Sequence, residues 1–467
     1  MMKPDEDHLK WYQGINSYQW LVLTVCSLGW IFDVFEGQVF VASMREAMPS
    51  LVPTHVDQGH IDFLNKMAMA SFLIGGALGG VLFGSMADRI GRSKTLAITI
   101  IVYSLFTFIT AFAQTPWQMI ILRFVVALGT GGEWAVGAAF VAEVFPKRSR
   151  PAMGSIFHGS SVLGTILAVI VGAYVIGNQS LGENSWRWGF AIGALPAVLV
   201  LWIRWKVKEP EKWVQAREAE GTGEKPQERA GSVRDLFDAT HWKLTVLGVA
   251  LATTGIATFW GVHIFGKNTT LDLHRNAVLE QAGLSQDQYD SAEALAVLEE
   301  KKGALKRAEM TGMLLNTLGA GVGLVCFGAI SGRMGRRGAF LFYYLGGFAV
   351  TLLLFQGVAK MDSWPIAAIA LPIFGFFTVG MHAGYAIYFP ELYPTRLRSV
   401  GSGFCFNVGR FTAAPILVIT ALLQKSKETG GMGWSNELLA SWMSVLFLLG
   451  AAIALMGPET KDQELPE

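Results

Sequence analysis

Two carboxylates stand inside an apolar stretch near the start of the chain, in the run SLGWIFDVFEGQVF. They are Asp33 and Glu36. A charge at the centre of a membrane helix costs about 2.5–3.5 kcal/mol on insertion scales, so such residues face the protein interior and pair. Intramembrane carboxylates can also bind and release protons. The first chemistry that the sequence suggests is therefore proton transfer inside a membrane.

A cation stands at a matching depth in a later apolar stretch. At 1.5 Å per helical residue, Asp33 and Arg123 each lie about 9 Å below the outer face of a hydrocarbon core about 30 Å thick. The match predicts an Asp33–Arg123 ion pair that opens when the aspartate is protonated, with a purely structural pair as the alternative. Glu36 is a further proton-coupling candidate, unless it simply reaches water at the outer face. Glu133, close to the inner face, is a candidate second proton carrier or gate residue.

A second arginine suggests the charge of a ligand. Arg410 lies near the membrane midplane in the apolar run SVGSGFCFNVGRFTAAPILV. A guanidinium in a cleft of low dielectric suits a bidentate contact with a carboxylate. The alternative is a pair with an internal carboxylate. Aromatic and amide side chains on neighbouring spans are candidates for the rest of a substrate site, although each alone is more often a packing residue: Phe259, Trp260, Asn316, Tyr385 and Asn407.

Other reactive side chains do not form a catalytic pattern in the sequence. Neither a Ser/His/Asp or Cys/His arrangement nor a metal-ligand spacing is present, so the sequence predicts no enzyme, no metal site and no cofactor beyond a proton gradient. Single histidines near span ends, His158, His263 and His382, are not expected to couple transport. Three separate cysteines in apolar runs are expected to be packing residues.

The elements that must position these residues are membrane helices. Of the 467 residues, 52% are hydrophobic and only 16% charged, and the mean hydropathy is +0.40. The net charge of +1 gives no indication of nucleic-acid binding. A spanning helix needs about 20 mostly apolar residues. The sequence predicts twelve such spans, near 19–45, 66–87, 94–113, 117–142, 152–176, 187–205, 243–265, 309–331, 339–358, 364–389, 399–422 and 437–456.

The distribution of basic residues predicts the orientation. Lysines and arginines gather in alternate short loops, which marks those loops as cytoplasmic. Both termini and a polar linker over 207–240 then lie inside, and a long charged segment over 266–308 lies outside. We expect a multi-pass protein of the plasma (inner) membrane that acts as a monomer in the lipid bilayer.

The two halves of the chain repeat one another. VAEVFPKRSRPAMGS resembles FPELYPTRLRSVGSG at an offset of 248 residues, and GSMADRIGRSK resembles GAISGRMGRRG at an offset of 244. The repeat predicts an N-terminal six-helix bundle over 1–206, the linker over 207–240, and a C-terminal six-helix bundle over 241–467. A stripe of glycines from Gly75 to Gly84 is expected to let helices pack closely.

These motifs carry a resemblance to a known family. The run Gly84-x-x-x-Asp88-Arg89-x-Gly91-Arg92 resembles the signature of the major facilitator superfamily. The stretch from Arg123 through Glu133 to Pro146 is similar to bacterial metabolite–proton symporters, including sialic acid carriers. The ending Pro458-Glu459-Thr460-Lys461 is similar to the sugar-porter and organic-ion branches. The second copy of the signature departs from the pattern, because Gly332 stands in place of the aspartate, so its ionic latch should be weaker.

The resemblance implies an all-α membrane protein with twelve helices in two pseudo-symmetric bundles, which rock around a central site. It also implies a cytoplasmic gate, formed by Gly84, Asp88, Arg89, Gly91, Arg92, Glu143, Arg150, Glu391 and Arg398. Sugar–proton symporters of this family carry an Asp and an Arg at the positions of Asp33 and Arg123, and the organic-anion branch carries an arginine at the position of Arg410.

The function expected from these features is secondary active transport of a small organic anion, a carboxylate, by proton symport with alternating access. A sugar or polyol–proton symporter and a non-transporting membrane sensor on the same fold are the alternatives. The identity of the anion, the coupling ion and the choice between symport and exchange stay open at this stage.

Overall fold

The computed structural model describes residues 11–53, 58–182, 184–195, 232–284, 288, 291–361, 363–394, 397–424, 431–463 and 466. Over these residues the regular elements are helices, without a strand. Ten helical stretches in this part of the chain are long and apolar enough to cross a membrane. One of them, Lys302–Lys360, contains the predicted eighth and ninth spans, and the predicted sixth span is described only over its first part. The all-α membrane fold predicted from the sequence is confirmed.

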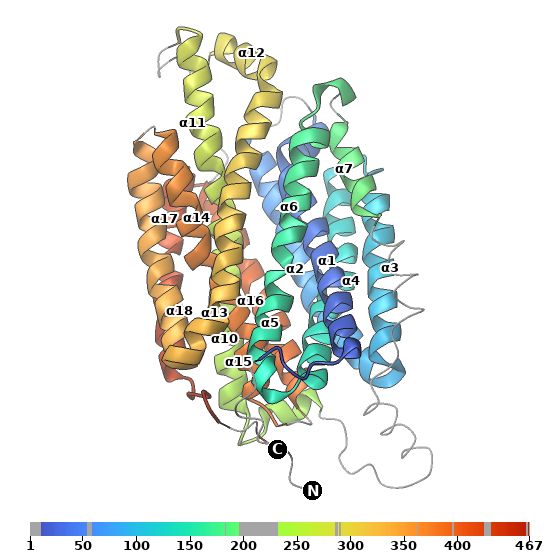
Figure 1. Cartoon of the computed structure of the whole chain (residues 1–467). Helices are drawn as coiled ribbons and strands as arrows, with labels where there is room; N and C mark the ends of the chain where they lie inside the picture. Colours follow the sequence, from blue (N-terminus) through green and yellow to red (C-terminus); the bar gives the residue numbers. More distant parts are fainter. Residues whose placement is uncertain are drawn as a thin grey trace, which may run out of the picture.

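The helices of each half form one bundle, and the two bundles lie side by side (Figure 1). The first half contains α1 (Ser17–Ser50), α2 (Gln58–Ile90), α3 (Arg92–Thr110), α4 (Pro116–Val144), α5 (Arg150–Gly159), α6 (Ser161–Val171) and α7 (Ser185–Gly193). The second half contains α10 (Trp242–Gly261), α11 (Gly266–Gln281), α12 (Ala292–Glu300), α13 (Lys302–Leu352), α14 (Trp364–Gly380), α15 (His382–Glu391), α16 (Arg398–Gln424), α17 (Asn436–Met443) and α18 (Val445–Met456). The predicted linker lies outside the described residues over 207–231.

Two glycines mark the same bend in each half. Gly91 precedes α3 with a φ of 109°, and Gly335 interrupts α13 with a φ of 80°. Residues with a Cβ rarely adopt these angles, so glycine is required where the chain turns sharply between two helices. The two positions are related by the offset of 244 residues, so the repeat read from the sequence is also a repeat of backbone conformation.

Glycine stripes bring helices together in both halves. A Cβ on Gly79 of α2 would overlap the backbone carbonyl of Leu128 in α4, and one on Gly323 of α13 would overlap the carbonyl of Phe376 in α14. The two contacts are equivalent under the repeat. Small residues allow this close approach in lipid, where van der Waals packing drives helix association. The predicted packing role of the glycine stripe is confirmed.

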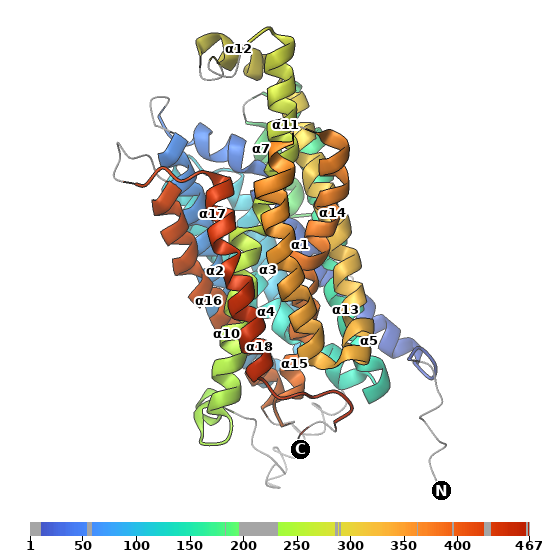
Figure 2. The same ribbon diagram turned by 90° about the vertical axis from the view of Figure 1, so that its left-hand side faces the viewer.

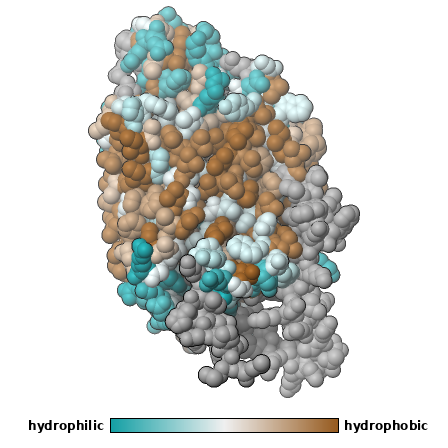
Figure 3. Space-filling view, viewed as in Figure 1, coloured by the Kyte–Doolittle hydropathy of each residue, from teal (hydrophilic) through white to brown (hydrophobic). Residues whose placement is uncertain are grey.

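The outer surface of the bundle fits a lipid environment. On the face that Figure 3 shows, a broad hydrophobic band crosses the middle of the molecule, with hydrophilic side chains at both ends. Large apolar side chains of the spanning helices are more than half exposed, among them Leu82, Ile121 and Val322. In water such a continuous apolar surface would drive aggregation. The protein therefore spans a membrane with this band in contact with lipid.

The charged segment over 266–308 extends the bundle at one end. Figure 2 shows α11 and α12 rising beyond the neighbouring helices, at the end opposite to the marked C-terminus. This end is called the α12 end below, and the opposite end the α15 end. The described residues of the segment lie mostly in α11, α12 and the start of α13, and two of its charged side chains, Lys267 and Lys306, are buried rather than exposed.

Candidate functional site

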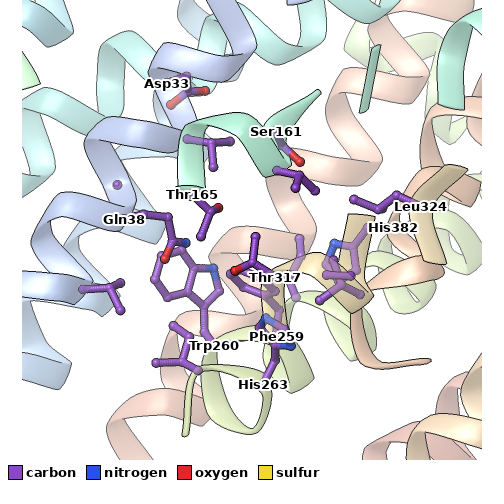
Figure 4. A pocket seen from close by; sticks show the side chains of 18 of the residues that line it. Asp33, Gln38, Ser161, Thr165, Phe259, Trp260, His263, Thr317, Leu324 and His382 are labelled. Atoms are coloured by element: carbon purple, nitrogen blue, oxygen red, sulfur yellow. The ribbon is translucent and has the colours of Figure 1, made fainter. Parts of the chain in front are cut away.

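A cavity of about 150 Å³ lies between the two bundles. Figure 4 shows side chains from several helices converging on it: Asp33 and Gln38 from α1, Ser161 and Thr165 from α6, Trp260 from α10, and Thr317 from α13. Outside the cavity, the halves meet where α2 packs on α16, α5 on α15, and α6 on α13. The cavity is thus at the interface that must rearrange if the two bundles rock against each other.

Arg410 contributes a cation to this cavity. Its guanidinium lies 4.9 Å from the ring centroid of Phe406, one turn earlier in α16. The Nη1 atom is buried and has no hydrogen-bond partner. A buried guanidinium with an unused donor is costly unless a polar or anionic group occupies the space it faces. Arg410 therefore brings an incompletely paired guanidinium to the wall of the cavity, where its Nη1 atom lies against Gly76 of α2.

Asp33 is the acidic side chain of the same cavity. It is buried, with 5% of its surface exposed, and its Oδ2 atom has no hydrogen-bond partner. Its charge interacts with that of Arg410, and the hydroxyl of Thr130 is a neighbouring donor. Asp33 and Arg410 come from opposite halves of the molecule, so this interaction links the two bundles.

The predicted pairing of Asp33 with Arg123 is wrong, because the structure pairs Arg123 with Glu36. Arg123 Nη1 lies 2.6 Å from Glu36 Oε1, and both side chains are completely buried. The hydroxyl of Thr107 donates to the same carboxylate oxygen at 2.9 Å. The guanidinium also packs on the ring of Phe190, 5.0 Å from its centroid. Glu36 therefore does not reach water.

Helix rotation explains this correction. Asp33 and Glu36 differ in depth by less than one turn, about 5 Å, which a long arginine side chain can bridge. Depth therefore cannot choose between the two carboxylates. The partner of Arg123 depends on where each side chain points around the axis of α1. Glu36 points toward α3 and α4 inside the first bundle, while Asp33 faces the cavity.

Glu133 is a third buried acid of the first half. It is 3% exposed, and neither carboxylate oxygen has a hydrogen-bond partner. Its carboxyl group lies against Gly29 of α1, where only a residue without a side chain leaves room. Its charge interacts with that of Asp33. Of the predicted proton-coupling acids, Glu36 is paired with Arg123, while the charge of Asp33 interacts with those of both Glu36 and Glu133.

Aromatic side chains and histidines line the second-half wall of the cavity. Phe259, Trp260 and Asn316 lie at this wall, as the sequence predicted. His263 stacks on the ring of Phe259 at 5.1 Å, and its backbone carbonyl accepts from the Asn316 amide at 3.1 Å.

Three histidines at the cavity were missed by the sequence reasoning: His158, His263 and His382 all line it. Their positions near the ends of predicted spans suggested that they lie far from the substrate site. In the structure, however, helices end or begin next to these three histidines at the level of the cavity.

Two predicted substrate residues do not line the cavity. The Tyr385 hydroxyl is hydrogen-bonded to that of Tyr344 at 3.0 Å, inside the second bundle. The Asn407 amide donates to the carbonyl of Gly403 at 2.9 Å and packs against Gly80. Both helices carry the right residue types, but the side chains point away from the central space.

The gate residues are described mainly in the second half. Arg336 donates to both carboxylate oxygens of Glu391, at 2.8 and 2.9 Å. Glu459 accepts from the backbone N–H of Arg336 at 2.8 Å, and Thr460 donates to Glu391. Glu391 thus pairs the guanidinium of Arg336 although Gly332 replaces the acid of the first copy, and Glu459 of the closing motif holds the backbone of Arg336 and Arg337.

Other gate residues make contacts within one half. Arg150 donates to the carbonyl of Phe145 and Arg398 to that of Pro390, each at 3.1 Å. Gly84 has open space around it. The side chains of Asp88, Arg89, Arg92 and Glu143 lie outside the described part of the structure, so their gate role stays a prediction.

The Glu36–Arg123 pair should be important for stability. Removing one partner of a buried ion pair typically costs about 3–5 kcal/mol, because the other charge is left uncompensated. We expect Arg123→Ala to lower the thermal unfolding temperature of the purified protein strongly. The double variant Glu36→Gln/Arg123→Met should recover much of that loss. Equal destabilisation by the single and double variants would show that the pair itself is not what stabilises the bundle.

Comparisons with known proteins agree with this architecture. Residues 37–416 match the family model described as Major Facilitator Superfamily. The chain is 26% identical to the niacin transporter NiaP of Acinetobacter baylyi, over 97% of this chain and 96% of that protein. It is 25% identical to the sialic acid transporter NanX of Escherichia coli, over 87% and 88% of the two chains.

A solved structure of the proton:xylose symporter XylE superposes with a TM-score of 0.69 at 18% identity, covering 96% of this chain and 98% of that one. At this identity the likeness concerns the fold. Together with the family match over most of the chain and the relatives that transport metabolites, it identifies the class of protein rather than its cargo. The chain is a membrane transporter, not an enzyme, and it belongs to the major facilitator superfamily.

Proposed function

We propose that this transporter moves a small single-ring carboxylate across the plasma membrane together with protons. The observation that carries the proposal is the unpartnered, buried Nη1 atom of Arg410 at a cavity between the two halves. A neutral sugar does not need a buried guanidinium, whereas a carboxylate accepts two parallel hydrogen bonds from it.

The size of the cavity favours one ring. Its volume of about 150 Å³ matches that of engineered apolar cavities that hold a benzene molecule. Niacin, the cargo in the name of one relative, is a ring of this size with a carboxylate, whereas the sialic acid in the name of another relative is a larger sugar acid. The rings of Phe259 and Trp260 provide flat apolar surface for such a ring.

Asp33 provides a way to couple the anion to a proton. Ionised Asp33 partly neutralises Arg410, with which its charge interacts. When Asp33 takes up a proton, the guanidinium is free to bind a substrate carboxylate. The proton and the anion therefore favour each other's binding, which is the thermodynamic basis of symport. Glu133, next to Asp33, extends the path of the proton, and the Glu36–Arg123 pair holds the first bundle together.

The orientation of the carrier follows from its basic loops. The α15 end carries the arginine-rich loops, so it faces the cytoplasm, and the α12 end faces outward. The monomer contains the complete cavity, since both of its walls come from one chain.

A substrate panel tests the proposal. Purified carrier in proteoliposomes, with an inward pH gradient, should accumulate labelled nicotinate or benzoate and should take up xylose no faster than empty vesicles. N-acetylneuraminate, as a larger carboxylate, should compete weakly. Concentrative uptake of xylose that benzoate does not inhibit would support the sugar-porter alternative instead.

A further inference from the structure

A cluster of five charged residues joins the two halves at the α12 end. Lys306 Nζ lies 3.0 Å from Glu46 Oε2 and 3.0 Å from Glu309 Oε2, and Lys267 Nζ lies 2.7 Å from Glu309 Oε1. Arg45 is 3.7 Å from the same oxygen of Glu309. Arg45 and Glu46 belong to α1 of the first half, and the other three belong to α11 and α13 of the second half. We call this group the five-charge cluster.

The lysines of the five-charge cluster also bind the backbone of α1. Lys267 Nζ donates to the carbonyl of Val41 at 2.9 Å, and Lys306 Nζ donates to the carbonyl of Ala42. Both lysines are more than nine-tenths buried. They reach these acceptors only while α1 stays close to α11 and α13, so the contacts depend on the closed arrangement of the α12 end.

The charges of the cluster are unevenly divided between the halves. Arg45 and Glu46 on α1 cancel. Lys267, Lys306 and Glu309 on the second half leave one positive charge. When the halves separate at the α12 end, the lysines lose Glu46 and both α1 carbonyls and share a single carboxylate. Opening therefore exposes the positive charge of the two lysines, which Glu46 and the two α1 carbonyls contact only while the end is closed.

Two further acids of the second half lie near the cluster. Asp272 of α11 interacts with the charges of Arg45, Glu437, Arg275 and Glu309. Arg275 offsets one of these two acids. The positive charge of the site is therefore local: it belongs to Lys267 and Lys306, which share Glu309 once Glu46 has moved away.

Lys267 connects the cluster to the substrate path, because it also lines the central cavity that holds Arg410. We propose that Lys267, supported by Lys306, is an anion-capture site at the entrance of the cavity, which engages a carboxylate before the substrate reaches Arg410. The transport meaning of this site rests on the proposed function, but its attraction for anions does not. An ammonium on a flexible stem suits a transient contact of this kind, whereas the planar fork of an arginine suits the final one.

Charged thiol reagents test the site without a substrate. Cys26, Cys326 and Cys405 are all free cysteines, so they are first replaced by alanine. A single cysteine is then placed at Gln38, which lines the cavity. The rate of labelling from the α12 side is measured with the anionic sulfonatoethyl and the cationic trimethylammonioethyl methanethiosulfonate. The ratio of the two labelling rates reports the electrostatic potential at residue 38. A variant that changes the fraction of open carriers changes both rates by the same factor and leaves this ratio unchanged.

We expect Lys267→Gln to lower the ratio of anionic to cationic labelling rates about fivefold. A unit charge roughly 8 Å from the cysteine in water attracts the anionic reagent and repels the cationic one by about 0.5 kcal/mol each, and the ratio combines both effects. Glu309→Gln removes the remaining negative charge and should raise the ratio. Lys267→Arg should keep it. The matched control is Lys302→Gln at the same end, where the lysine is half exposed and paired with Glu299, and it should change little.

Transport measurements give a second readout. In proteoliposomes, Lys267→Gln should raise the KM for benzoate entering from the α12 side several-fold, with a smaller change in kcat. An unchanged reagent ratio in Lys267→Gln overturns the capture site even if benzoate is transported. Absence of benzoate transport by the wild-type carrier would instead refute the proposed function, and the reagent test would still decide on the site.

Discussion

Arg410→Ala should weaken binding of benzoate or nicotinate at least about 30-fold, because truncating one partner of a buried charge contact typically costs about 2–5 kcal/mol. Binding is measured by scintillation proximity or by ligand-induced thermal stabilisation of the purified carrier. Arg410→Lys keeps the charge but loses the planar fork, so it should bind carboxylates weakly and still prefer them to neutral analogues.

The position of Arg410 makes this test specific. Its counterpart under the 248-residue repeat is Val162, which lines the same cavity from the first half. The repeated scaffold therefore accepts an apolar residue at this place, and the charge is an addition on one side only. Phe411, the next residue of α16, is about half exposed on the outer surface. Phe411→Ala is the matched control and should leave affinity unchanged.

Loss of folding must be separated from loss of binding. Arg410→Ala leaves Asp33 buried without its neighbouring cation, which is itself destabilising. The double variant Asp33→Asn/Arg410→Ala removes both charges and should restore stability without restoring carboxylate binding. If Arg410→Ala binds benzoate as tightly as the wild type does, Arg410 is not the substrate contact and the carboxylate proposal fails.

The sequence predicted the charged residues that matter better than it predicted their partners. Arg410 and Asp33 can be identified from the sequence alone, because a charged side chain in a membrane helix is costly and is usually there for function. The partner of Arg123 could not be found in the same way. Depth along a helix is readable from residue number, but the rotation that turns Glu36 toward Arg123 is set by packing against neighbouring helices.

The sequence placed the charged segment over 266–308 on the outer side of the membrane, but it could not show which of its charged side chains are buried. Its composition is that of an exposed loop, and Lys301 and Lys302 are indeed exposed on it. Lys267 and Lys306 of this segment, and Glu309 directly after it, are buried because α1 approaches from the other half of the chain. Local hydropathy cannot register a contact between residues more than 200 positions apart, so the five-charge cluster becomes visible only in three dimensions.

Asp33→Asn should abolish proton-driven accumulation and preserve exchange. A 1:1 symporter of a proton and a monovalent anion can concentrate its cargo about tenfold per unit of pH gradient, since one pH unit is worth about 1.4 kcal/mol per proton. The amide cannot release a proton, so accumulation by the variant should fall to that of empty vesicles under the same pH gradient. Counterflow of benzoate against internal benzoate should continue, because the neutral amide resembles protonated Asp33 and leaves Arg410 available.

The pH dependence of binding provides the sign of the coupling. In the wild type, raising the pH ionises Asp33, which competes with the substrate for Arg410, so affinity for benzoate should fall. In Asp33→Asn this competitor is absent, and affinity should stay constant over the same range.

Asp238→Asn, at an exposed acid hydrogen-bonded to His241 outside the bundle, is the control and should accumulate benzoate normally. Should Asp33→Asn vesicles still concentrate benzoate under a pH gradient, the proton site must be elsewhere, and Glu133, buried without a partner beside Asp33, would be the next residue to replace.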